Sequence, residues 1–516
     1  MKGFFMLRLL FVLTLSLLFA RASFANEFIV MADDAGASDN FGKSVAVWGD
    51  YAIIGSPYDD DLGTNAGAAY IFHWTGSDWV QQKKLTASDG EANDNFGSAV
   101  AIYGDYAIVG AFAEDDSGGG AGAAYIFYRN TGGTDNWGQQ AKIIGSDTES
   151  GDWFGISVAL YGTYAVVGAE KDDDGGTDAG AAYLFQRSGT SWNQKAKLVA
   201  SDPADYDHFG IAVSMDGDYI VVGARDKLYD NSTTYAGAAY VFVPSGRDWV
   251  QDAKLTAPNP QTQAYFGGSV DVSGNTVVIG EADRDTSATN AGAAYVFIYS
   301  REQWSHQATL AASGPQEGAR FGKSVAISGD SIIVGSYLYD KRGLTDAGAA
   351  YLFVRNSGSW SQTEQIFASD AEAEDDFGYS VDINNPHYIC GAFQADSPQW
   401  TNAGAAYIFS PVTSAIENPE VKRVDISGFA LYENYPNPFN PSTTIRLAVP
   451  VEGSKQRIQL NIYNMLGQKV AEVFEGRLKA GVHEMRWDAS NMPSGQYIVL
   501  LQAGNFSVSK RITLVK

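Results

Sequence analysis

A five-residue motif that recurs at a regular interval decides what this chain can fold into. Ala-Gly-Ala-Ala-Tyr appears seven times, ending at Tyr70, Tyr125, Tyr183, Tyr240, Tyr295, Tyr351 and Tyr407. Successive copies are 55 to 58 residues apart. A Phe-Gly pair keeps the same interval, at Phe41, Phe96, Phe154, Phe209, Phe266, Phe321 and Phe377. A period of this length indicates one supersecondary unit repeated seven times, from about residue 27 to residue 411.

Each unit has the composition of four short strands. In the second unit, strand-forming residues dominate 98–103, 106–111, 123–128 and 137–144, and residues that favour turns separate these segments. We name the four strands A to D. Four antiparallel strands at this period are typical of a β-propeller blade. We therefore predict an all-β fold, with a seven-bladed propeller over residues 26–411.

The two ends of the repeated region complement each other. The seventh unit stops after its C strand, at Phe409, and lacks the Trp-x-Gln-x-x-Lys-Leu segment that forms strand D elsewhere. Residues 27–34 (EFIVMADD) align with segments such as 83–89 (KKLTASD). We expect the N-terminal segment to pair into the last blade as its outer strand and close the ring.

The single cysteine, Cys390, replaces a Val or Ile of other B strands and is expected in the core.

The first 25 residues have the pattern of a secretory signal peptide. Lys2 and Arg8 precede an apolar run over 9–20, and cleavage is predicted after Ala25. The run is too short to span a membrane, and no later segment has eighteen consecutive apolar residues. We expect an exported monomer that is soluble or attached to a surface, and not integral to a membrane.

The charge of the repeated region restricts its partners. Residues 26–416 hold 51 acidic and 20 basic residues, a net charge of −31. Such a surface repels a phosphate backbone, which argues against nucleic acid as a partner. The acidic residues gather in the B-to-C loops and the D-to-A connections, which leave an antiparallel blade on the same face. We call this face the loop face, and we expect arginines on the opposite face, near C-to-D turns: Arg129, Arg187, Arg247, Arg301 and Arg355.

The B-to-C loops offer carboxylates that suit a hard cation. Calcium takes six to eight oxygen ligands, and acidic Gly-rich loops can wrap it. The richest loop is 172–178 (DDDGGTD), but it lacks the full twelve-residue calcium loop. The alternative is that these residues stabilise turns through side-chain hydrogen bonds. The candidate calcium ligands are Asp60, Asp115, Asp172, Asp173, Asp174, Asp178, Asp285, Asp340 and Asp396.

The D-to-A connections carry paired carboxylates. One Asp lies seven residues before Phe-Gly and another two residues before it, and the fifth and sixth units lack both. Joint presence or absence suggests that the two act in one turn, either sharing a cation or, as we favour, capping backbone amides. The pairs are Asp34/Asp39, Asp89/Asp94, Asp147/Asp152, Asp202/Asp207 and Asp370/Asp375.

The repeats resemble the FG-GAP repeats of integrin-α-type propellers. The resemblance rests on Phe96-Gly97, Gly104-Asp105, 108–111 (IVGA) and 122–127 (GAAYIF) and their counterparts in the other units. It implies ligand recognition on a loop face. In that family calcium sits in A-to-B loops of the form D-x-D-x-D-G, whereas here this connection is only Gly-Asp-Tyr or a relative. The resemblance therefore implies that any metal lies on the other face.

A polar linker over 412–428 leads to a second region, 429–516, in which we predict a small Ig-like β-sandwich. This region resembles the C-terminal sorting domain of type IX secretion through 435–441 (YPNPFNP), 463–468 (YNMLGQ), 481–483 (GVH) and 493–497 (PSGQY). The resemblance implies export through both membranes by the type IX secretion machinery, followed by surface attachment. A plain Ig-like adhesive module is the alternative.

Together these patterns predict a secreted or cell-surface adhesion protein whose propeller binds an extracellular glycan or protein. A passive matrix component and a carbohydrate-active hydrolase are the alternatives. We expect no enzymatic activity, because the five histidines occupy unrelated positions in the repeats and no Ser, His and Asp arrangement recurs. The sequence assigns no cofactor beyond calcium, and it leaves the ligand open.

Overall fold

The computed structural model describes residues 26–229, 235–410, 429–431, 441–449, 456–465, 468–478, 481–504 and 506–515. The expected signal peptide with its cleavage site, the linker and most of the 435–441 motif lie outside these residues. All regular elements in the described part are strands, and none of its segments forms a helix long and apolar enough to cross a membrane. The chain divides into two compact units, residues 1–414 and 415–516.

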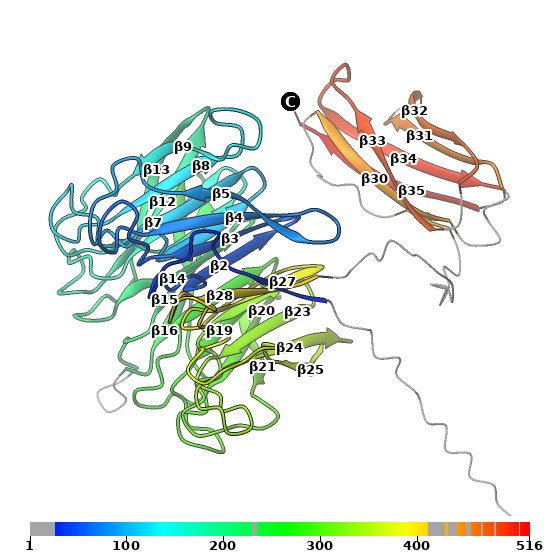
Figure 1. Cartoon of the computed structure of the whole chain (residues 1–516). Coiled ribbons are helices and arrows are strands. Elements are labelled where there is room, and N and C mark those ends of the chain that lie inside the picture. Colours follow the sequence, from blue (N-terminus) through cyan, green and yellow to red (C-terminus); the bar gives the residue numbers. More distant parts are fainter. Residues whose placement is uncertain are drawn as a thin grey trace, which may run out of the picture. The chain divides into compact units, whose positions relative to one another are not determined.

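Each of the first four repeats folds into one four-stranded antiparallel sheet (Figure 1). Their strands are β2 Ser44–Trp48, β3 Tyr51–Ser56, β4 Ala68–Trp74 and β5 Trp79–Leu85; β6 Ala99–Tyr103, β7 Tyr106–Ala111, β8 Ala123–Tyr128 and β9 Gly138–Ile143; β10 Phe154–Tyr161, β11 Tyr164–Ala169, β12 Ala181–Ser188 and β13 Ser191–Leu198; β14 Phe209–Asp216, β15 Tyr219–Ala224, β16 Ala238–Ser245 and β17 Asp248–Leu255.

The last three repeats form three more sheets of the same kind. Their strands are β18 Ser269–Ser273, β19 Thr276–Glu281, β20 Ala293–Ser300 and β21 Gln303–Leu310; β22 Val325–Ser328, β23 Ser331–Ser336, β24 Ala349–Asn356 and β25 Ser359–Ile366; β26 Ser380–Asn384, β27 His387–Ala392 and β28 Ala405–Ser410. Seven such sheets are consistent with a seven-bladed propeller.

The fourth strand of the last sheet comes from the N-terminus. β1 (Asn26–Val30) pairs antiparallel with β28, with Glu27 opposite Phe409 and Ile29 opposite Tyr407. The predicted pairing of the N-terminal segment is therefore present. Glu27 also accepts a hydrogen bond from the amide of Ser369, in the preceding connection, at 3.0 Å.

The two repeated motifs explain how neighbouring sheets join. In every unit the Phe ring of Phe-Gly packs against the Tyr of the longer motif, edge-on in six of the seven, as Phe96 does on Tyr125 at 5.4 Å. The same Phe donates its backbone N–H to the previous unit, as Phe96 does to Ala66 at 3.0 Å. The corresponding bond from Phe41 to Ala403, also 3.0 Å, joins the first unit to the seventh.

The glycine of the longer motif is required by this junction. Gly67 has a φ of +86°, and a Cβ added to it would lie 2.1 Å from the carbonyl oxygen of Phe96. Only glycine allows so close an approach of two backbones in this conformation.

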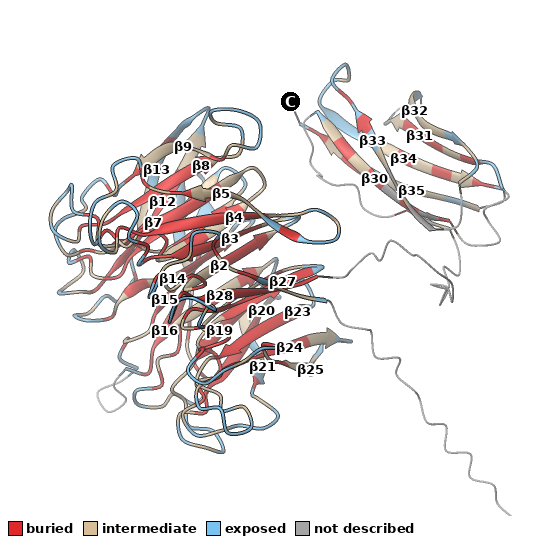
Figure 2. Ribbon diagram, viewed as in Figure 1, coloured by how far each residue is buried: buried red, intermediate tan, exposed pale blue. Residues whose placement is uncertain are grey.

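The core runs through all seven sheets, with the strands buried and the connections exposed (Figure 2). Cys390 is fully buried, as expected.

The second unit contains two sheets. One comprises β29 Ala430–Leu431, β30 Ser442–Val449 and β33 Gly481–Asp488, and the other comprises β32 Lys469–Gly476, β31 Ile458–Asn464, β34 Gly495–Ala503 and β35 Phe506–Leu514. Runs of strand-forming residues predict six strands in this region, at 444–449, 458–463, 469–474, 482–487, 496–503 and 506–515, and all six are present. Leu447, Leu460 and Leu501 are fully buried in one core, and Trp487 packs edge-on against Tyr497 at 5.5 Å.

Candidate functional site: the loop face of the propeller

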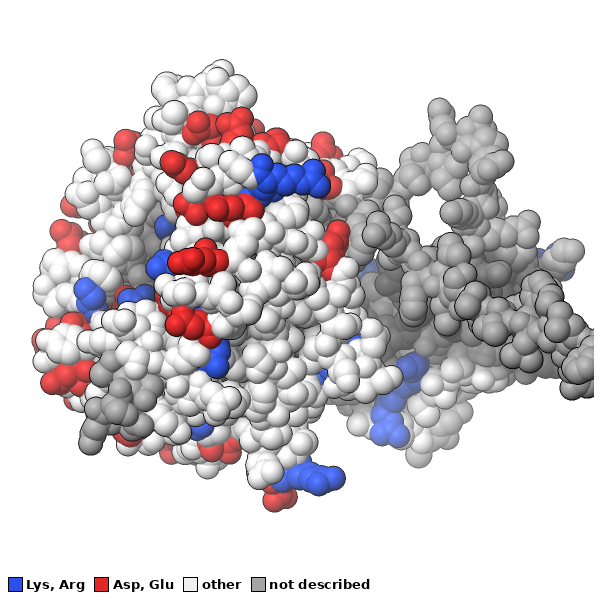
Figure 3. Space-filling model, turned by 90° about the horizontal axis from the view of Figure 1, so that it is seen from below, with Lys and Arg blue, Asp and Glu red and all other residues white. Residues whose placement is uncertain are grey.

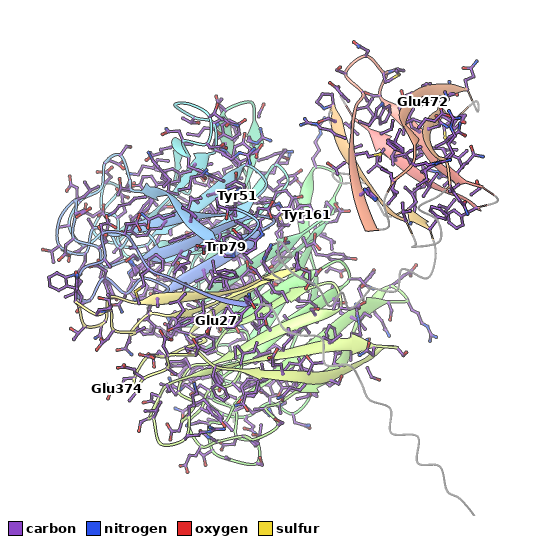
Figure 4. All side chains as sticks on the ribbon, turned by 45° about the vertical axis from the view of Figure 1, so that its right-hand side comes forward. Glu27, Tyr51, Trp79, Tyr161, Glu374 and Glu472 are labelled. Carbon is purple, nitrogen blue, oxygen red and sulfur yellow. The ribbon has the colours of Figure 1, made fainter. Side chains whose placement is uncertain are left out.

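The B-to-C loops and D-to-A connections meet on the same face of the propeller. Asn93, in a connection, donates its amide to the carbonyl of Thr64, in a loop, at 2.8 Å. Figure 4 shows Glu374, from another connection, on the opposite side of the propeller from Tyr161, which ends an A strand. The A-to-B turns on that opposite side contain two residues each, such as Gly104 and Asp105. They have no room for the calcium loop of integrin-type repeats.

A lysine lies at the centre of three carboxylates in each of the first three units. The Lys84 ammonium lies 2.8 Å from Asp34, 2.8 Å from Asp59 and 2.6 Å from Asp61. The same arrangement surrounds Lys142 and Lys197, with carboxylates from Asp89, Glu114 and Asp116 and from Asp147, Asp172 and Asp174. We call these the lysine-centred clusters. Each draws one acidic residue from a D-to-A connection and two from a B-to-C loop.

Burial and hydrogen bonding compete in these clusters. One carboxylate of each cluster is nearly inaccessible to solvent; in the cluster around Lys197 this is Asp172, with 3% of its side chain exposed. It also accepts a hydrogen bond at 2.6 Å from the hydroxyl of Tyr183, in the repeated motif. Burial alone would lower the pKa of Lys197, but its hydrogen bonds to the carboxylates outweigh this effect and raise the pKa. The lysine therefore stays charged and acts as the internal counter-ion of the cluster.

The fourth and fifth units use a different cation for the same purpose. Lys227 lies 2.7 Å from Asp207, and Arg284 lies 3.0 Å from Glu281. Both basic residues come from the B-to-C loop and not from strand D. An internal cation beside a buried carboxylate is thus common to five units, although the residue that supplies it changes.

The two members have separate partners in four of the five predicted carboxylate pairs, whereas in the fourth pair Lys227 lies near both, 3.7 Å from Asp202 and 2.7 Å from Asp207. The first member contacts a strand-D lysine or the motif tyrosine; Asp370, for example, accepts a hydrogen bond from Tyr407 at 2.9 Å. The second member caps the backbone amide three residues earlier. These caps are Asp39 on Gly36 (2.6 Å), Asp94 on Glu91 (2.8 Å), Asp152 on Glu149 (2.7 Å), Asp207 on Ala204 (2.7 Å) and Asp375 on Glu372 (2.6 Å). Burial raises the pKa of Asp39, Asp94 and Asp152 to about 6.

Most candidate calcium ligands in the B-to-C loops hold their own loop together. Each accepts a hydrogen bond from an amide five or six residues later: Asp60 from Asn65 (2.7 Å), Asp173 from Asp178 (2.7 Å), Asp285 from Asn290 (2.9 Å), Asp340 from Asp346 (3.0 Å) and Asp396 from Asn402 (2.8 Å). Asp115 is exposed at the equivalent position. Asp172 and Asp174 contact Lys197, as described above.

Among the described residues, one group of three carboxylates lies close enough together to share a metal ion: Asp34, Asp59 and Asp61. Its three oxygens surround the Lys84 ammonium. A calcium ion would have to displace this lysine, so the donor set does not fit calcium while Lys84 is in place.

A cavity of about 310 Å³ opens on the loop face near the inner strands of the fourth to sixth units. Arg225, Tyr265, Arg320 and Lys323 contribute to its walls, together with Asp226 and Asp283. Asp226 accepts hydrogen bonds from His208 at 2.6 Å and from Arg225 at 3.0 Å. Burial opposes ionisation of Asp226, but these two bonds prevail and lower its pKa.

Sequence reasoning missed both the lysine-centred clusters and this cavity. The lysines were visible as part of a repeated strand, but the carboxylates that they contact come from other connections. The cavity residues immediately flank Phe-Gly or follow strand B, where the units differ most from one another. The differences among the seven units at these positions are the sequence signal that could have indicated the cavity. The predicted acidic loop face is in fact mixed, and Figure 3 shows basic and acidic side chains next to each other on the propeller surface.

Seven sheets built on one repeat place this chain among the repeat-built β-propellers. A comparison with protein-family models finds the FG-GAP repeat at residues 25–72, 79–127, 137–185, 192–242, 249–297, 304–353 and 360–409. These copies cover more than half of the chain, which therefore belongs to the FG-GAP repeat family. No curated protein matches the chain.

The same comparison finds a secretion system C-terminal sorting domain at residues 433–515. Both resemblances drawn from the sequence are thereby confirmed. The sorting domain directs the protein through type IX secretion to the cell surface or the extracellular space.

Proposed function

We propose that this protein is an extracellular binding protein, an adhesin, whose propeller recognises a glycan or protein ligand on its loop face. The observation that carries this proposal is the number of exposed apolar side chains in the B-to-C loops. Exposed aromatic residues on loops held by a rigid scaffold favour ligand contact. The residues are Tyr58, Leu62, Leu228, Tyr229, Tyr235, Leu344 and Trp400, each at least 36% exposed.

The proposed scaffold is a closed ring. Two contacts support closure. β1 forms the outer strand of the seventh sheet, as strand D does in every other sheet, and the hydrogen bond from Phe41 to Ala403 matches the one that joins every other pair of neighbouring units. A closed ring holds the loops in fixed relative positions, which lowers the entropy cost of binding a ligand.

We propose that lysine ammonium groups take the place that calcium would have on this face. Calcium titration into the full chain, with magnesium as control, is expected to leave the melting temperature unchanged. In Lys84→Ala, which retains Asp34, Asp59 and Asp61, calcium is expected to restore part of the lost stability. Saturable stabilisation of the unsubstituted protein by calcium would contradict this proposal.

The experiment that tests the binding function is a screen of the full chain against immobilised glycans and matrix proteins, with turnover assays on the same glycans. Binding that falls at least tenfold in Tyr235→Asn and Trp400→Ala, with unchanged melting temperature, supports an adhesin. Absence of any ligand would favour the passive matrix component. Turnover that disappears on substitution of one carboxylate would favour the hydrolase.

A further inference from the structure

The cavity on the loop face concentrates positive charge within a strongly acidic domain. Its walls contain Arg225, Arg320 and Lys323 against two carboxylates, whereas residues 26–416 carry a net charge of −31. Both arginine side chains are 40% exposed. Basic side chains that face an opening in such a domain attract one negative group locally, while the surrounding acidic surface repels a polyanion.

Neighbouring carboxylates orient both arginines, and those of Arg320 leave part of its guanidinium available. Arg225 lies 3.0 Å from Asp226 through Nε and 3.9 Å from the buried Glu170 through Nη2. Arg320 binds Asp283 through Nε at 2.8 Å and the hydroxyl of Tyr337 through Nη1 at 2.8 Å. Its Nη2 has no hydrogen-bond partner within the part of the chain that the structure describes. A guanidinium held in this way is preorganised to bind a carboxylate.

The lysine in the wall has an aromatic neighbour and no ion pair. The Lys323 ammonium lies 4.8 Å from the centre of the Tyr379 ring. No carboxylate lies within ion-pair distance of it among the residues described. This contrasts with Lys84, Lys142 and Lys197, each of which contacts three carboxylates. The Lys323 ammonium is therefore available to a group from outside the protein.

Two tyrosines next to the cavity adopt a backbone conformation that disfavours them. Tyr265 and Tyr235 have φ angles of +60° and +55°, and their rings stack at 6.3 Å. Every unit has a positive φ at the position equivalent to Tyr265, where the first two units hold Asn40 and Asn95 (+57° and +56°) and the next two hold Trp153 and His208 (+58° and +52°). Asparagine tolerates this left-handed region better than a bulky residue, so the backbone at Tyr265 accepts asparagine.

From these observations we propose that the cavity binds the acidic sugar at the end of an otherwise neutral glycan. Arg320, Arg225 and Lys323 bind the sugar carboxylate, and the ring of Tyr265 packs against the apolar C–H face of the sugar. A ligand with one carboxylate fits a small cavity with basic walls inside an acidic surface. The ring of Tyr265 in the wall favours a saccharide over an acidic peptide. This inference rests on the proposed binding function and specifies its ligand class.

The test is calorimetric titration of the full chain with matched pairs of oligosaccharides. The probes are sialyllactose against lactose and a glucuronate-capped xylo-oligosaccharide against its uncapped parent. We expect at least one capped sugar to bind tenfold or more tightly than its parent, and this preference to weaken at high salt. Equal affinity within both pairs would overturn the proposal, as would binding of neither capped sugar.

The variants identify the site. Arg320→Ala is expected to weaken binding at least tenfold, and Tyr265→Asn to do so without loss of melting temperature, because asparagine suits the backbone there. Arg247→Ala, on the opposite face, is the control. If capped sugars bind equally well to Arg320→Ala and Tyr265→Asn, the assigned site is wrong. If the screen instead finds a neutral glycan or a protein whose binding Arg320→Ala does not change, the adhesin function stands and this inference fails.

Discussion

The ammonium group of Lys197 shows how a single residue organises the loop face. It joins Asp147, from the connection before its unit, to Asp172 and Asp174, from the B-to-C loop of its own unit. Three carboxylates that lie within hydrogen-bond distance of one ammonium group would repel one another without that cation between them. Asp172 is buried and has few alternatives for solvation.

Replacement of Lys197 by alanine is therefore expected to lower the free energy of unfolding by about 2 kcal/mol, because a buried carboxylate loses its charged partner. Lys195, two residues earlier on the same strand, is exposed. Lys195→Ala should change stability by less than about 0.5 kcal/mol. Urea unfolding of both variants tests this expectation, and equal effects of the two substitutions would contradict the role of the cluster.

The inner strands of the propeller carry partly buried carboxylates that connect neighbouring units. Asp271, on β18, accepts hydrogen bonds from Ser214 at 2.6 Å and from the amide of Ile327 at 2.7 Å. Asp382, on β26, accepts one from the amide of Val47 at 2.7 Å. Burial raises the pKa of Asp271 to about 7 and that of Asp382 to about 6.

These shifts predict how stability depends on pH. A carboxyl group with a raised pKa in the folded state binds its proton more tightly there than in the unfolded chain, so stability is lost as the pH rises. We expect the free energy of unfolding to fall between about pH 4 and pH 7. Asp271→Asn, which cannot ionise, should show a smaller decrease over this range. Denaturant unfolding from pH 4.5 to 8 measures both, and a free energy that rises with pH would contradict the assignment.

Removal of the N-terminal strand is expected to cost much more stability than its few side chains suggest. Deletion of residues 26–34 exposes the edge of β28 and removes buried Val30 and Ala32. We expect the free energy of unfolding to fall by at least about 4 kcal/mol. A variant with a Gly-Ser segment of equal length in place of 26–34 separates loss of pairing from chain length. An unchanged melting temperature in the deletion would argue against the closed ring.

At the scale of elements, the repeat itself made the strands predictable. The four strands expected in the second unit match β6 to β9 to within one residue at each end, because alternating apolar residues and Gly-rich turns fix their limits. The lysine-centred clusters were not predictable in the same way. Asp34 and Lys84 are 50 residues apart and meet only because the connection before one unit lies beside that unit's D strand.

At the scale of the whole molecule, the sorting domain predicts a specific export defect. Without residues 429–516, the protein should enter the periplasm and remain there, because the signal for the type IX machinery is lost. Fractionation of cells that produce this truncation measures its location. Substitutions confined to the loop face, such as Arg320→Ala, are expected to leave export unchanged. Normal appearance of the truncated protein in the medium would contradict the sorting role.

The pairing of β1 with β28 has a consequence for the order in which the protein can be completed. Asn26 lies opposite Ser410, so the first strand to be synthesised pairs with the last strand of the seventh repeat. Until β28 emerges, β1 has unpaired edges during transport, and edges of this kind invite aggregation. Contacts this distant in sequence also form slowly. We therefore expect the nascent propeller to depend on a periplasmic chaperone that covers these edges, with the last repeat as the step that releases it.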